Sequence, residues 1–138
     1  EYLAIQLNQI RGRVTLLKMD DALPDSILDI GPRDVLVALE PRRATSTLVR
    51  MVGLFQNAGA AVAVISDEYP PQVLARVDFP IPVVITGVNA FDSYAAYIAV
   101  INAIVAALIE RSPANVRARL DRLEGLNVVF STWFEAGP

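Results

Sequence analysis

Apolar residues follow two different patterns along the chain, and together these patterns predict alternating strands and helices. Residues 35–39 and 61–65 are apolar at every position, which is typical of strands covered on both faces in a parallel sheet. Residues 14–17 form a shorter apolar run, and we expect another strand there. Residues 77–86 are also expected to be extended, with Pro80 and Pro82 confining them to a sheet edge.

Helical spacing of apolar residues predicts the helices between these segments. The expected helices cover residues 3–10, 23–30, 45–58, 72–76, 91–111 and 114–124. Breaking residues mark several of their ends, because Gly59 follows one helix, Pro113 separates two others and Gly125 closes the last.

Strands that alternate with helices over short connections predict an α/β fold. We expect a three-layer α/β/α sandwich around a mostly parallel five-stranded sheet, with flavodoxin-like topology, in a single domain over residues 1–138. Ligands of such folds bind at the carboxyl ends of the strands. The segments that follow residues 39 and 65 are therefore the first places to search for a site.

Composition narrows the possible chemistry. The chain has 138 residues, 54% of them hydrophobic and 20% charged, which excludes an intrinsically disordered protein. It contains no Cys and no His, which removes disulfides, thiolate or imidazole metal sites, and Ser-His-Asp or Cys-His catalysis. Carboxylates, hydroxyls, Arg and backbone dipoles remain for chemistry. We expect no metal, no cofactor and no catalytic residues. With 12 basic and 15 acidic residues the net charge is -3, so DNA binding by this segment itself is not expected.

The hydrophobic excess has its own explanation. The longest uncharged run lies between Asp92 and Glu110, which is shorter than the about 20 apolar residues of a membrane span. We expect a buried helix there and no membrane partner. No signal peptide precedes it and the chain begins at Glu1 without Met, so we expect a cytoplasmic piece of a longer protein. Because the helix is apolar all round, we expect a second copy to cover one side in a homodimer or higher homo-oligomer, with residues 130–134 adding to the contact.

The sharpest local signal is the connection from the strand 35–39 to the next helix. Hydroxyl groups and backbone N–H groups at a helix N-terminus favour an anion, and guanidinium groups would add charge-assisted hydrogen bonds. The residues that supply these groups are Arg42, Arg43, Thr45, Ser46 and Thr47. A capped helix beside two solvated arginines explains the same residues. Glu40 opposes an anion by its charge, and it would instead pair with an arginine or accept sugar hydroxyls.

Two pairs of neighbouring residues complete the candidate ligand-binding set. Ser66 and Asp67 follow the strand 61–65 and would line the same crevice, although Asp67 also suits a turn. Asp92 and Ser93 stand at the expected start of the long helix, where N-capping is the alternative explanation.

Several of these segments resemble a known family. The runs Asp34-Val35-Leu36-Val37-Ala38-Leu39, Asn57-Ala58-Gly59-Ala60 and Val64-Ile65-Ser66-Asp67 look like the SIS (sugar isomerase) domain, and more narrowly like the effector domain of RpiR-type bacterial transcription regulators. Phe91-Asp92-Ser93 before a long apolar helix, and Arg117 to Glu124 at the end, extend the resemblance over nearly the whole chain.

The resemblance implies a phosphosugar loop, which in the family reads Ser-x-Ser-Gly-x-Thr. Its serines fall on Glu40 and Arg42, its glycine on Arg43 and its threonine on Thr45, so only Thr45 is retained. Some regulators of this type resemble the chain in having a Pro-Arg or Arg-Arg loop here. A sugar phosphate, a different anionic or polar metabolite, or no ligand at all remain consistent with this loop.

These observations favour a ligand-sensing and dimerisation domain of a transcription regulator, with DNA bound only by an N-terminal helix-turn-helix domain outside this sequence. A stand-alone SIS enzyme acting on a phosphosugar is the alternative, and Glu40 would then be its general base. A structural dimerisation module with a decayed pocket is the third hypothesis. A sensor requires only ligand binding and a shift between two conformational states. An isomerase requires a general base with a catalytic partner, and Glu40 is a single carboxylate without an evident one.

Overall fold

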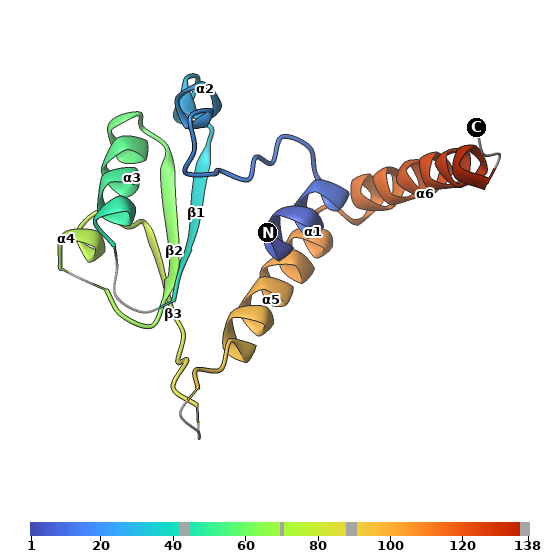
Figure 1. The fold of residues 1–138 in the computed structure, drawn as a ribbon. Coiled ribbons are helices and arrows are strands. Elements are labelled where there is room, and N and C mark those ends of the chain that lie inside the picture. Colours follow the sequence, from blue (N-terminus) through green and yellow to red (C-terminus); the bar gives the residue numbers. More distant parts are fainter. Residues whose placement is uncertain (42–44, 70, 88–90, 136–138) are drawn as a thin grey trace. The chain divides into compact units, whose positions relative to one another are not determined.

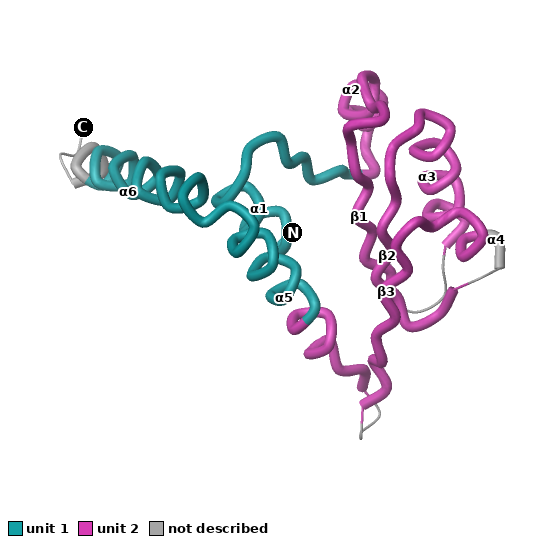
Figure 2. Tube along the Cα trace, turned by 180° about the vertical axis from the view of Figure 1, so that it is seen from behind, with its two compact units in different colours: residues 1–18, 100–138 teal, residues 19–99 magenta. Residues whose placement is uncertain are grey.

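A computed structural model describes residues 1–41, 45–69, 71–87 and 91–135, with only the backbone described at 71, 72 and 132–135. The chain forms two compact units (Figures 1 and 2). One unit comprises Met19–Ala99, and the other joins Glu1–Lys18 to Val100–Pro138. Each unit is built from its own set of elements.

The unit of residues 19–99 is built on a parallel sheet. Its strands are β1 (Val35–Glu40), β2 (Ala61–Ser66) and β3 (Phe79–Pro82), in the spatial order β1-β2-β3. Val35 lies opposite Ala61 and Glu40 opposite Ser66, so β1 and β2 end at the same edge. The proline-containing β3 is an edge strand of the described sheet, as its sequence predicts.

Two helices, α3 and α4, connect these strands, while α2 precedes β1, and α3 makes the main contact with the sheet. The helices are α2 (Leu23–Ile27), α3 (Ser46–Asn57) and α4 (Pro71–Leu74). Helix α3 packs against β1, β2 and α4 (Figure 1). Its buried residues include Leu48, Val52 and Phe55, and β2 is buried from Val62 to Ser66. Gly59 ends the α3 region with φ of 80°, a conformation that glycine adopts without strain.

The sheet differs from the sequence prediction in two respects. The described residues form three strands, not five, because residues 14–17 and 83–86 are not in strands. Burial on both faces holds for β2 but is wrong for β1, where Val35 is 56% and Leu39 37% exposed. Val35 and Leu39 lie on one face of β1 and the buried Leu36 on the other, so β1 is covered well on one face only.

The other unit is helical. Its helices are α1 (Tyr2–Ile10), the part of α5 (Ala95–Arg111) from Val100 onward, and α6 (Pro113–Glu135). Helix α1 packs against α6. The Tyr2 hydroxyl donates to Asn102 Oδ1 at 3.2 Å, which connects α1 to α5.

Helix bounds also depart from the predictions. Helix α2 ends at Ile27 and α4 at Leu74, earlier than expected, and α5 begins at Ala95, later than expected. Helix α6 runs through Gly125 to Glu135, so the prediction that Gly125 closes it is wrong. Leu126, Val129 and Phe130 continue the helical spacing beyond this glycine, and glycine inside a helix costs only about 1 kcal/mol relative to alanine.

Among the described residues, no single helix is long and apolar enough to cross a membrane. Helix α5 and residues 113–131 reach the required length and composition only as a pair, and they are bent by 107° at the break between them.

Candidate functional site

The candidate site lies where β1 and β2 end. Because the strands are parallel and Glu40 is registered with Ser66, the sheet brings these two residues together at one edge. Asp67 follows directly after β2, and Thr45 stands at the start of α3, which follows β1. The structure therefore gathers four of the predicted residues at the carboxyl ends of neighbouring strands.

Two hydroxyl groups converge on one backbone carbonyl at this edge. The Ser66 hydroxyl lies 2.9 Å from the carbonyl oxygen of Glu40 and 2.8 Å from that of Glu68, and its single proton can be donated to one of them at a time. The Tyr97 hydroxyl donates to the same Glu40 carbonyl at 2.9 Å. These bonds connect the end of β1 to the segment after β2 and to the first turn of α5.

Ser66 makes structural hydrogen bonds at this edge, and its role as a ligand contact stays a prediction. Its side chain has no exposed surface, and its hydroxyl also accepts the backbone N–H of Glu68 at 3.3 Å. A hydroxyl at the end of a central strand has carbonyl groups of neighbouring segments within reach, and here they satisfy it.

The Glu40 carboxylate already accepts one of the backbone N–H groups that an anion would use at this site. Its Oε1 accepts the backbone N–H of Thr45 at 3.1 Å, while the Thr45 hydroxyl accepts the N–H of Leu48 at 3.2 Å and caps α3. The capping explanation therefore holds for Thr45. Ser46 and Thr47 follow in the exposed first turn of α3, whereas Arg42 and Arg43 lie outside the described residues.

Two tyrosines belong to this edge although the sequence pattern did not single them out. The Tyr69 hydroxyl donates to the Val64 carbonyl at 2.8 Å, and burial raises the pKa of Tyr69. Burial, together with the charges of Asp67, Tyr69, Glu40 and Tyr94, raises the pKa of Tyr97 to about 12. Both phenols are consequently neutral hydrogen-bond donors at pH 7. A polar aromatic residue inside an otherwise apolar helix was the available signal for Tyr97.

Asp92 and Ser93 lie in the segment between β3 and α5. They precede α5, which begins at Ala95. The Ser93 backbone N–H donates to the Ile85 carbonyl at 2.8 Å, which connects the start of the α5 region to the segment after β3. Ser93 is exposed and Asp92 is half-buried.

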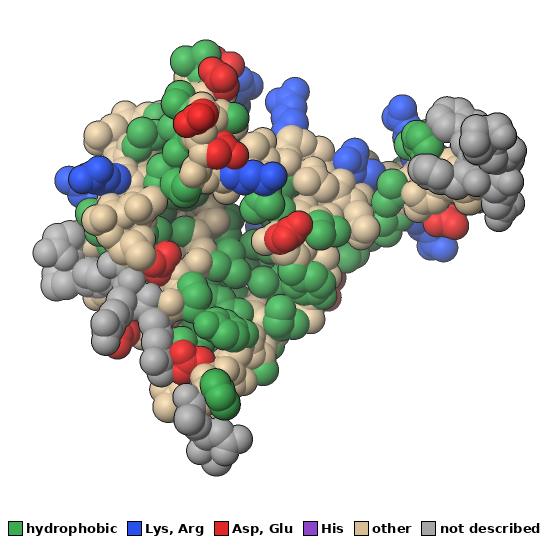
Figure 3. All heavy atoms as spheres, viewed as in Figure 1, with side chains coloured by type: hydrophobic (Ala, Val, Ile, Leu, Met, Phe, Trp, Pro, Cys, Tyr) green, Lys and Arg blue, Asp and Glu red, His purple; other side chains and the backbone are tan. Residues whose placement is uncertain are grey.

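Acidic side chains lie at the site, whereas basic side chains are scattered over the surface. Glu40 and Asp67 contribute negative charge, which is felt by Tyr97. Over the face shown in Figure 3, the Lys and Arg side chains are scattered singly between apolar and acidic ones and form no continuous basic patch. Among the described residues, no group of three or more acidic side chains is placed to hold a metal ion.

Comparison with known proteins rests on the fold. No known protein family matches the sequence, and neither does any curated protein. A solved structure of the sugar isomerase domain of an RpiR transcription factor from Sphaerobacter thermophilus is similar, with a TM-score of 0.78 and 21% identity. The match covers 89% of this chain and 69% of that one.

Two further solved structures are similar. The Vibrio vulnificus NanR protein, solved in complex with ManNAc-6P, matches with a TM-score of 0.71 and 15% identity over 94% of this chain and 50% of that one. A hypothetical protein matches with a TM-score of 0.60 and 15% identity over 86% and 68% of the two chains. The chain thus has an α/β fold like that of the sugar isomerase domain, and the resemblance read from the sequence is confirmed at the level of fold.

Proposed function

We propose that the chain is the ligand-sensing and dimerisation domain of a bacterial RpiR-type transcription regulator. The observation that carries the proposal is its fold, which is like that of two regulators, one of them solved with a bound sugar phosphate. In this proposal a separate N-terminal helix-turn-helix domain contacts DNA, and the protein acts in the cytoplasm.

The ligand of the proposal is a sugar phosphate or another small polar or anionic metabolite at the carboxyl ends of β1 and β2. The N-terminal turn of α3 offers the hydroxyls of Ser46 and Thr47, and Arg42 and Arg43 from the preceding segment would supply positive charge. In the proposal, the carboxylates of Glu40 and Asp67 accept sugar hydroxyls. Asp92 and Ser93 complete the proposed set from the segment before α5.

The proposal assigns sensing and no catalysis to this site. Aldose–ketose isomerisation requires a base that reaches a substrate carbon. Glu40 is the acid at the end of β1, and one of its oxygens already accepts the Thr45 N–H. Incubation with aldose and ketose 6-phosphates, followed by NMR of the sugar, is expected to show no interconversion, and steady turnover would favour the enzyme instead.

Ligand binding is tested by thermal unfolding with sugar 6-phosphates, the parent sugars and inorganic phosphate. A ligand at 100 times its Kd is expected to stabilise the protein by about 2.7 kcal/mol. Arg42→Ala and Arg43→Ala should weaken the response to phosphorylated sugars, whereas Arg50→Ala, at an exposed position on α3, should not. Absence of stabilisation by every sugar phosphate would contradict the proposed ligand class.

Dimerisation is supported by apolar side chains on α5 and α6. On α5, Tyr97, Ile101 and Val105 are buried along one side, whereas Ile98 on another is 43% exposed. On α6, Leu126 is 49% exposed. Apolar helix surface of this kind is usually covered in an assembly, and a second copy related by two-fold symmetry is the simplest cover.

The oligomeric state is tested by light scattering coupled to size-exclusion chromatography. The protein is expected to elute as a dimer or higher oligomer at micromolar concentration. Leu126→Glu should shift it toward the monomer, whereas Leu28→Glu, at a position 76% exposed in the other unit, should leave the mass unchanged. A wild-type monomer at this concentration would remove dimerisation from the proposal.

A further inference from the structure

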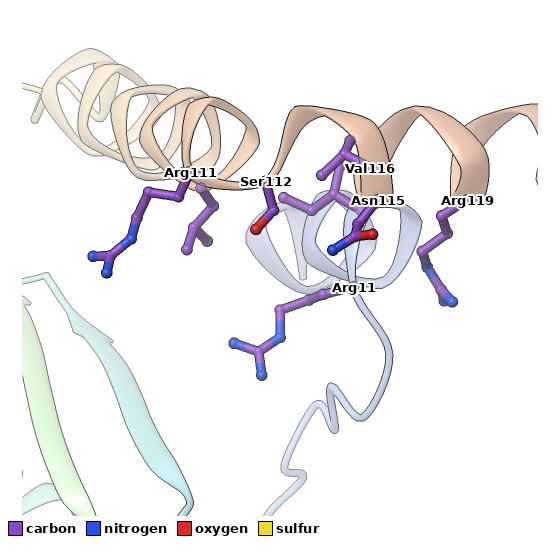
Figure 4. Close-up of a pocket in the computed structure, with 8 residues that line it drawn as sticks. Arg11, Arg111, Ser112, Asn115, Val116 and Arg119 are labelled. Carbon is purple, nitrogen blue, oxygen red and sulfur yellow. The ribbon is translucent and has the colours of Figure 1, made fainter.

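A cavity lies in the helical unit, where α1 ends, α5 ends and α6 begins. Its volume is about 420 Å³, within the range of small-molecule sites in proteins. The apolar part of its lining consists of Ile10, Leu108 and Val116, and Val116 is only 6% exposed. The polar part is drawn in Figure 4.

Positive charge dominates that polar part. Arg11 follows the last residue of α1, Arg111 is the last residue of α5, and Arg119 lies on α6. The eight residues that line the cavity are all described, and none of them is acidic. The net charge of the chain is -3, whereas these three arginines make the surroundings of the cavity positive.

The arginines are not equivalent. The Arg119 guanidinium donates from Nε at 3.3 Å and from Nη2 at 2.8 Å to the Asn8 carbonyl oxygen, which fixes its position against the end of α1. Arg11 and Arg111 extend to the same side of the helices as the Ser112 hydroxyl (Figure 4). Among the described residues, no hydrogen bond engages the guanidinium group of Arg11 or Arg111, which leaves both for a ligand, with Arg119 contributing charge beside them.

The backbone adds donors at the same place. Val116 N–H donates to the Ser112 carbonyl, so α6 starts immediately after Ser112. Pro113 has no N–H, and the first N–H groups of a helix have no intrahelical acceptor. Those of Ala114 and Asn115 are thus available at the positive end of a 23-residue helix.

We propose that this cavity binds a small dianion, namely a phosphate monoester, with its phosphate between Arg11, Arg111 and the start of α6. Paired guanidinium forks match phosphate oxygens geometrically. The apolar lining would receive the carbon part of the ligand. The site is distinct from the strand ends and uses none of their residues, so it stands or fails independently of the function proposed above.

The direct test is a phosphate titration of the full chain followed by two-dimensional NMR of its backbone N–H groups. Inorganic phosphate and phenyl phosphate are the probes, and succinate distinguishes a dicarboxylate from a phosphate. The signals of Ser112, Ala114 and Asn115 are expected to shift and saturate, with phenyl phosphate binding more tightly than inorganic phosphate. Succinate binding as tightly as phenyl phosphate would overturn the phosphate assignment.

Substitutions decide between a site and general charge attraction. Arg111→Ala is expected to weaken phosphate about tenfold, as loss of a charged hydrogen-bonding group does, and Arg111→Lys less. Arg117→Ala removes the same charge from an exposed position of α6 outside the cavity and should leave affinity unchanged. Equal weakening by Arg117→Ala, or undiminished binding in both Arg111 variants, would overturn the proposal.

The strand ends provide an internal reference in the same spectra. If phosphate shifts only the Thr45 region, the cavity proposal fails while the sensor proposal stands. If phosphate shifts only the start of α6 and sugar phosphates do the same, the sensor site fails while the cavity stands. If Arg11 and Arg111 serve only to offset the negative ends of α1 and α5, Arg111→Ala lowers the melting temperature and no probe shifts the start of α6, which also overturns the cavity proposal.

Discussion

The Tyr97 hydroxyl donates a hydrogen bond to the backbone carbonyl of Glu40 at 2.9 Å, across 57 positions of sequence. The tyrosine side chain is only 4% exposed. The bond joins the first turn of α5 to the end of β1, at the edge of the sheet where the proposed ligand binds. A change in the position of Glu40 therefore reaches α5 directly through Tyr97.

Removing this hydroxyl should cost measurable stability. Tyr97→Phe is expected to lower the free energy of unfolding by about 1 kcal/mol, because a buried hydrogen bond is lost while Ser66 can still donate to Glu40. Urea unfolding at pH 7 measures the change. Tyr94→Phe is the matched control, since Tyr94 is 53% exposed, and an equal loss in both variants would contradict a specific role for Tyr97.

The same tyrosine makes stability depend on alkaline pH. Its pKa is raised from 10.0 in the unfolded chain to about 12 in the fold. Above pH 10 the unfolded state therefore loses the Tyr97 proton while the folded state still holds it. The stabilisation that Tyr97 gives the fold is complete below pH 10 and is lost as the pH rises toward 12. A fall of about 2 kcal/mol over this interval is expected from Tyr97. Tyr97→Phe should flatten the decline in urea unfolding between pH 9 and 12, and an identical decline in both proteins would contradict the assignment.

The cap of α3 gives a third prediction. Thr45→Ala removes the hydroxyl that accepts the Leu48 N–H and is expected to destabilise the fold by about 1 kcal/mol. Thr47→Ala, at an exposed position of the same turn, should change stability by less than about 0.5 kcal/mol. Thermal unfolding of the two variants makes the comparison, and a larger loss in Thr47→Ala would be inconsistent with the observed cap.

Asp78 holds β2 at the entry to β3. Its Oδ2 accepts the Val62 N–H at 2.7 Å, and its own N–H donates to the Val62 carbonyl at 3.0 Å. Asp78→Ala leaves the Val62 N–H without this acceptor and should cost about 1–3 kcal/mol in urea unfolding. Asp21→Ala, at an exposed turn position, should be close to neutral, and similar losses would argue against the bond.

Two glycines should respond in opposite directions to alanine. Gly125 lies inside α6 with no heavy atom within 4 Å of an added Cβ, so Gly125→Ala should stabilise by about 0.5–1 kcal/mol. At Gly59 the φ is 80° and an added Cβ would lie 3.2 Å from Pro32 Cγ, so Gly59→Ala should destabilise. Thermal unfolding with helicity by circular dichroism measures both, and stabilisation by Gly59→Ala would contradict the backbone described.

The sequence predicted the two strands that meet at the site, because an unbroken apolar run between polar ends has few alternatives. It placed a strand at residues 14–17 wrongly, since an apolar run becomes a strand only if a neighbouring strand pairs with it. Hydropathy likewise could not distinguish β1 from β2, because β1 is apolar on both faces yet covered well on one face only. Helix α6 continues past Gly125 because the residues beyond this glycine keep helical spacing, and a single glycine destabilises a helix only slightly.

At the site, the gathering of Glu40, Thr45 and Asp67 followed from parallel strands ending at one edge. The Glu40 carboxylate accepting the Thr45 N–H was not predicted, because the sequence indicated a salt bridge or sugar hydroxyls as partners of Glu40. Tyr97 was missed for another reason. A contact between residues 57 positions apart leaves no trace in local periodicity.

The helical unit draws its first and last segments from opposite ends of the chain, and Arg119 joins α6 to Asn8 across 111 positions. During synthesis, α1 therefore emerges long before its partners exist, while residues 19–99 can already form the parallel sheet. Contacts this distant form late, because the entropy of closing so long a loop is lost first. The contacts of α1 with α6 therefore cannot form until α6 itself has been synthesised.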